Sequence, residues 1–152
     1  MDLQELLTRE GDQIIAEASE ALTRSQLAHY AEAGHAVGQE RLARLFQLTA
    51  QGIADRNLVP VMEYMAEVAD DRFHAGYAIR EVQIAINVLE EAIWNHIVVN
   101  VPPDELARAL GLVSTVLGAA KDSLARAYVS LASQTKAPSL DLSALFKGET
   151  AG

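Results

Sequence analysis

The chain has 152 residues, of which half are hydrophobic and only 5% aromatic, and its formal net charge is −9. This length predicts one domain with a real core, and the acidic charge argues against nucleic acid and anionic membranes as partners. The absence of cysteine excludes disulfides and thiolate chemistry. The N-terminus shows no signal-peptide pattern and no apolar run is long enough for a membrane span, so we expect a cytoplasmic protein.

Apolar residues recur at helical spacing along most of the chain. They predict an all-α helical bundle of five or six helices without a β-sheet, over residues 1–134, followed by a flexible tail over 135–152. The first helix is expected over 2–22. Residues 23–37 predict a short helix that loosens near Gly34, and a second long helix begins near Gly38 and ends at Asn57. One uninterrupted helix from Ser25 to Arg56 is the alternative.

Pro60 suits the first turn of the next helix, and Gly76 suits a left-handed cap at its end. The helix that follows, over 78–100, is apolar around most of its circumference, which predicts a central position in the bundle. The last helix is expected over 104–134, with a heptad-like apolar stripe and several small residues within it.

Two groups of polar residues deserve consideration as binding sites. Asp71 and His74 have carboxylate-x-x-His spacing, with Glu67 one turn earlier, but helical di-iron sites need a second such pair that this chain lacks. We therefore predict no metal, and a metal-dependent helical-bundle enzyme using these three residues ranks last. The competing interpretation is a solvated acidic face with a histidine near the C-terminal end of the helix dipole.

His96 lies in the otherwise apolar central helix beside Trp94. It could ligate haem, contact a small molecule or sense pH, and Asn87 and Glu90 on the same helix could mark a pocket with it. The alternative is a core histidine that is hydrogen-bonded to a backbone carbonyl or side chain. We expect His29 and His35 to face solvent.

Catalytic motifs are missing from the sequence. It contains no GxSxG, and no strand is predicted that could lead into a phosphate-binding loop. Neither His74 nor His96 is followed by the acidic residue expected of a phosphorylated histidine on a bundle helix. We predict no enzymatic activity and no cofactor.

The stretch RFHAGYAIREVQIAINVLEEAIWNHIV contains the residues of a family resemblance: Gly76 with Ile79, Arg80, Glu81 and Val82, then Ala92, Ile93 and Trp94. Over about residues 41–128 the chain resembles the N-terminal domain of RsbRD-type RsbT co-antagonist proteins. The resemblance implies an all-α sensory or regulatory domain, dimeric and without enzymatic activity, of a kind also fused to bacterial signalling modules. No output module follows here, so a stand-alone regulator and a truncated sensory domain are both open.

Apolar faces wider than one small bundle needs predict a homodimer that relays a signal, as in stress-response regulation, through protein–protein contacts. The alternative is a small-molecule or haem sensor built around Trp94 and His96. In the tail, Leu142, Leu145 and Phe146 could form a docking peptide, and a linker is the competing interpretation.

Overall fold

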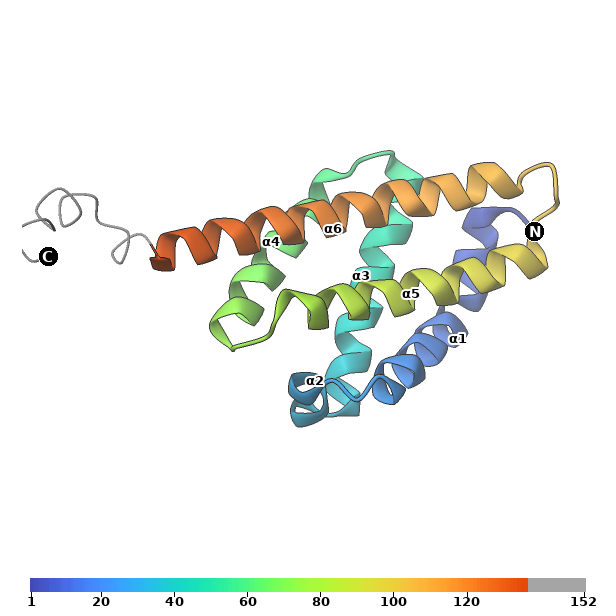
Figure 1. Cartoon of the computed structure of the whole chain (residues 1–152). Helices are drawn as coiled ribbons and strands as arrows, with labels where there is room; N and C mark the ends of the chain where they lie inside the picture. Colours follow the sequence, from blue (N-terminus) through green and yellow to red (C-terminus); the bar gives the residue numbers. More distant parts are fainter. Residues whose placement is uncertain (137–152) are drawn as a thin grey trace, which may run out of the picture.

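The computed structural model describes residues 1–136, with side chains to 134, and this part of the chain is built from α-helices without a strand (Figure 1). The prediction of an all-α bundle of five or six helices is confirmed. The six helices are α1 (Leu3–Arg24), α2 (Ala28–Ala33), α3 (His35–Asp55), α4 (Val59–His74), α5 (Ile79–Asn100) and α6 (Leu106–Lys136).

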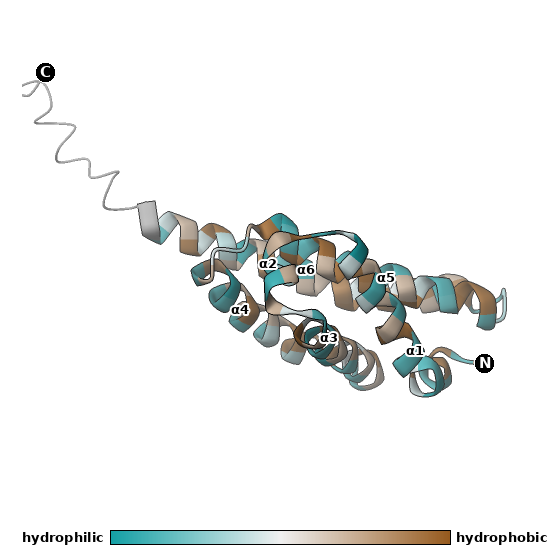
Figure 2. Ribbon diagram, turned by 90° about the horizontal axis from the view of Figure 1, so that it is seen from below, coloured by the Kyte–Doolittle hydropathy of each residue, from teal (hydrophilic) through white to brown (hydrophobic). Residues whose placement is uncertain are grey.

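The helix α5 lies in the middle of the bundle, as its apolar circumference predicts. It packs against α1 and α6, and α3 crosses behind it (Figure 1). Along the ribbon, hydrophobic and hydrophilic residues alternate, so each long helix has one side for the core and one for solvent (Figure 2). The core-facing stripe of α5 is buried: Val82, Ile86, Leu89, Ile93 and Ile97.

A helix that spans a membrane must be both long and apolar. None of the described helices combines these two properties.

The segment between α1 and α3 contains a short helix, as predicted, but α3 begins at His35, three residues before the expected Gly38. The alternative of one uninterrupted helix is wrong. Gly34 has φ 94° and ψ 157°, which no α-helical residue adopts, and Gln26 also has a positive φ of 53°. Two left-handed residues therefore flank α2.

The end of α3 corrects a detail of the sequence analysis. The left-handed residue is Arg56, with φ 52° and ψ 45°, and not Asn57. Asn57 instead accepts a hydrogen bond from the backbone N–H of Val59 at 3.1 Å, so its side chain supports the start of α4. At the other end of α4, Gly76 has φ 89°, as predicted for a left-handed cap.

Replacing Arg56 by Gly is expected to raise the free energy of unfolding by about 0.5–1 kcal/mol, because glycine has no Cβ to oppose the left-handed conformation. Chemical denaturation would measure the change. Ala66→Gly, at an exposed position inside α4, is the matched control and should lower the free energy of unfolding by about 1 kcal/mol. Destabilisation by Arg56→Gly would contradict the assignment of strain to this residue.

Candidate functional site

His96 lies where α5 meets α1, between two carboxylates. Its Nδ1 is 2.5 Å from Glu10 Oε1, and its Nε2 is 2.8 Å from Glu17 Oε2. Because both ring nitrogens face acceptors, the ring satisfies both only when each nitrogen carries a proton, which makes it a cation between two anions. Asn100 adds a longer amide contact to Glu10 at 3.4 Å. We call His96, Glu10 and Glu17 the histidine clamp.

The electrostatics of the histidine clamp favour the charged ring. Burial by itself would lower the pKa of His96, since an imidazolium loses hydration in the interior. The hydrogen bonds and negative charges of Glu10 and Glu17 outweigh burial, so the pKa is raised above its ordinary value of 6.5. The histidine clamp therefore joins the first helix to the fifth by charge as well as by packing.

The structure does not bring the predicted ligand residues together around His96. Trp94 is 40% exposed and Asn87 is exposed, whereas His96 is buried against α1. Glu90 accepts a hydrogen bond from Lys121 Nζ at 2.6 Å and so joins α5 to α6. A haem iron could reach His96 only by displacing one of its carboxylates.

The carboxylate-x-x-His pair on α4 is also dispersed. Asp71 pairs with Arg72, and His74 contacts Asp70 through the backbone oxygen at 2.8 Å, while Glu67 is exposed. Among the residues that the structure describes, no three His, Asp or Glu side chains are placed to hold a metal ion. The tail candidates Leu142, Leu145 and Phe146 lie outside the described residues.

A second histidine–carboxylate pair joins α2 to α5. His29 Nδ1 is 2.8 Å from Glu81 Oε2, and the carboxylate also accepts the backbone N–H of Ala78 at 2.9 Å. The latter bond is half of a capping box, because Ala78 has no side-chain oxygen to return it. Burial would raise the pKa of Glu81, but the hydrogen bonds from His29 and Ala78 lower it. The prediction that His29 faces solvent holds only in part, since its side chain is 35% exposed and pairs with Glu81, whereas His35 is exposed.

Two arginines and two tyrosines border a small, half-open cavity between the helices, which we call the inner cavity. Its polar walls are Tyr30, Arg41, Tyr64 and Arg72, its volume is about 30 Å³, and its apolar walls include Leu42, Leu45, Met65, Val82 and Ile86. Arg41 Nη1 donates to Tyr77 Oη at 3.0 Å, and its guanidinium lies 5.9 Å from the ring centres of both Tyr30 and Tyr77. The cavity is thus lined by cationic and aromatic groups together with aliphatic side chains.

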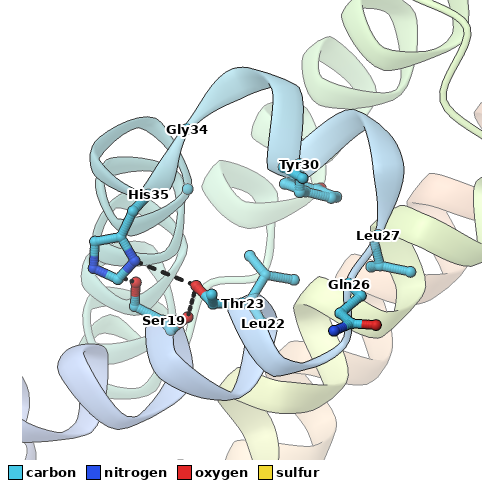
Figure 3. A pocket seen from close by; sticks show the side chains of 10 residues that line it. Ser19, Leu22, Thr23, Gln26, Leu27, Tyr30, Gly34 and His35 are labelled. Carbon is cyan, nitrogen blue, oxygen red and sulfur yellow. Dashed lines mark hydrogen bonds between the residues drawn. The ribbon is translucent and has the colours of Figure 1, made fainter.

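A larger hollow of about 230 Å³, the outer cavity, lies beneath α2 (Figure 3). His35 closes one side of it, with its ring 3.3 Å from Thr23 Oγ1 and 3.5 Å from Ser19 Oγ, and Leu27 and Tyr30 stand opposite. The inner and outer cavities share three lining residues, Leu22, Tyr30 and Gly38. The two cavities are therefore neighbours, and Tyr30 is the aromatic residue that borders both.

The tyrosines of this region stay neutral and leave the arginine charges in place. Burial raises the pKa of Tyr30, against the opposing charge of Arg72, and burial also raises the pKa of Tyr128 to about 12. Tyr128 donates to the backbone oxygen of Tyr77 at 3.0 Å, which holds the loop after α4 in place. A cationic pocket lined by neutral aromatic groups can bind an anion, but it offers no nucleophile–base pair.

Arg72 and Arg41 do not appear among the residues that the sequence analysis selects. Arg72 is the last of three consecutive charged residues that begin at Asp70, a pattern that predicts a solvent-facing surface. Its side chain is nevertheless only 8% exposed. Its position four residues after Val68, on the inner face of α4, is the signal that could have shown its burial.

Comparison with protein-family models, curated proteins and solved structures finds no match to this chain.

Proposed function

We propose that this chain is a non-enzymatic bacterial signalling domain that acts as a homodimer and relays a signal through protein–protein contacts. The observation that carries the proposal is an apolar ridge on α5. Trp94 is 40% exposed and Val98 is 60% exposed, and they lie one helical turn apart, so their side chains are neighbours. A second copy that covers this ridge would gain about 25 cal/mol for each Å² of apolar surface removed from water.

Two further observations support the proposal. Trp94 belongs to the residues through which the chain resembles RsbRD-type regulatory domains. The same helix also holds His96 and Glu81, whose carboxylate–histidine pairs reach α1 and α2. A shift of α5 at a dimer contact would therefore move groups that are bonded to α1 and α2, and a relay of the signal requires such coupling.

Light scattering coupled to size-exclusion chromatography tests the dimer. The unmodified chain is expected to be dimeric at micromolar concentration, and the double variant Trp94→Gln, Val98→Gln to be monomeric. Val129→Gln is the matched control, because Val129 is 66% exposed on α6 and lies outside the ridge. A monomeric unmodified chain, or a double variant that stays dimeric, would overturn the proposal.

A small-molecule sensor is the second candidate function. His96 is engaged at both nitrogens, so the Trp94 and His96 region is a poor place for haem or another ligand. The inner cavity favours the sensor hypothesis instead, because it places a buried cation beside aliphatic walls.

A further inference from the structure

Arg72 is buried with an unsatisfied hydrogen-bond donor. Its Nη1 pairs with Asp71 Oδ2, but its Nε has no partner among the described residues and no exposure to water. A buried donor without a partner costs about 1–3 kcal/mol, and more for a charged group. Such a group is unusual in a native fold, and it is explained if a ligand supplies the missing acceptor.

The charge around Arg72 favours an anion. Arg41 borders the same inner cavity, where it contacts the Tyr77 hydroxyl and the rings of Tyr30 and Tyr77. Asp71 is the carboxylate paired with Arg72, and its side chain is 65% exposed, so water screens it. The two charged side chains that line the cavity are therefore both arginines, in a chain of net charge −9.

The planar guanidinium group of an arginine matches the geometry of a carboxylate. In a guanidinium group, Nε and Nη2 share the edge that lies away from Nη1, and this edge matches the two oxygens of a carboxylate. The pairing of Nη1 with Asp71 leaves the Nε on that edge of Arg72 without a partner among the described residues, while the Tyr30 hydroxyl lies within hydrogen-bonding reach of the same guanidinium. The aliphatic side chains in the lining disfavour a fully hydrated ion and suit a ligand with an apolar body.

We propose that the inner cavity binds the carboxylate of a small organic acid through Arg72 and Arg41, with the apolar body of the acid beneath α2. The inner cavity, at about 30 Å³, has room for little more than the head group, and the outer cavity, at about 230 Å³, has room for the body. The site goes beyond the proposed dimer and does not depend on it.

Tyr30 is one of three residues that line both cavities. It stands on α2, a helix of six residues between two left-handed residues, Gln26 and Gly34. Such residues at the ends of a short element can act as hinges. The hydrogen bond between His29 and Glu81 joins α2 to α5.

Binding is tested with octanoate and phenylacetate as probes, measured by calorimetry and by the ¹⁵N spectrum of the arginine Nε–H groups. Each acid is expected to bind at least about tenfold more tightly than its amide, which lacks the charge. Acetate and inorganic phosphate, which lack an apolar body, should bind more weakly than either acid. If neither acid binds more tightly than its amide at millimolar concentration, the proposal is wrong.

Substitution of the arginine locates the site. Arg72→Met should weaken octanoate and phenylacetate binding by about tenfold or more, and the Nε–H signal that disappears in this variant should be the one that shifts with ligand in the unmodified chain. We expect Arg72→Met to keep or raise its Tm, because an apolar side chain of similar length removes a buried charge. Arg41→Gln is the second variant, in case Arg72→Met folds poorly, and should also weaken binding.

Arg108→Met is the matched control, since it removes the same charge from an exposed position on α6. It should leave binding unchanged. Equal binding by Arg72→Met and Arg41→Gln, or an equal loss in Arg108→Met, would show that the acids bind elsewhere.

Discussion

Replacing Leu89 by Ala is expected to lower the free energy of unfolding by about 2–5 kcal/mol, the range for a leucine truncated in a well-packed core. Leu89 is fully buried at the middle of α5, the helix that packs against both α1 and α6. Its removal leaves a cavity that three helices would have to close together. Denaturation by urea, followed by far-UV circular dichroism, would measure the loss.

Leu112→Ala provides the control for this prediction. It deletes the same atoms from α6, but Leu112 is only partly buried at the edge of the core, so the loss should be less than half as large. Equal losses in the two variants would contradict the central position of α5. A change in the slope against urea would indicate that the variant alters the unfolded chain or breaks two-state unfolding.

The positions of the long helices could be predicted because the pattern that indicates each helix lies within its own segment of the sequence. A stripe such as Val82, Ile86, Leu89 and Ile93 repeats with the helical period, and burial of that stripe is what stabilises the helix. Helix ends were less predictable. Asn57 and Arg56 are neighbours, and which of them adopts the left-handed conformation depends on whether the Asn57 side chain is needed at the start of α4.

The candidate site could not be predicted in the same way, because its contacts join distant segments. Glu10 and His96 are 86 residues apart, and nothing in the spacing of either helix indicates that the two side chains meet. The burial of Arg72 is likewise set by tertiary packing, which here overrides the polar character of its neighbours Asp70 and Asp71. Periodicity identifies the buried side of α4, but it does not show that a cation on that side lacks a partner.

The histidine clamp is expected to make stability depend on pH. His96→Gln should lower the free energy of unfolding by about 1–3 kcal/mol near pH 6, because the variant loses a charged donor between two carboxylates. The pKa of His96 is raised in the folded chain. Protonation therefore favours folding: its contribution is fully present below the ordinary value of 6.5 and is lost as pH rises through the higher pKa of the folded state.

The measurement is urea denaturation of both chains over a series of pH values. The difference in the free energy of unfolding between His96→Gln and the unmodified chain should be largest below pH 6.5. It should shrink as pH rises above the folded-state pKa of His96. His74→Gln is the matched control, since this histidine is 65% exposed on α4, and its profile should follow that of the unmodified chain.

The carboxyl group of Glu81 gives a different pH profile. The pKa of Glu81 is lowered in the folded chain, so its contribution is present above its ordinary value of 4.5 and is lost as pH falls through the lower folded-state pKa. The contribution of Glu81 to the free energy of unfolding therefore changes only at acid pH. It decreases as pH falls, whereas the contribution of His96 decreases as pH rises. A difference between His96→Gln and the unmodified chain that stays constant from pH 6 upwards would mean that His96 contributes by packing alone, and that the clamp is not an ion pair.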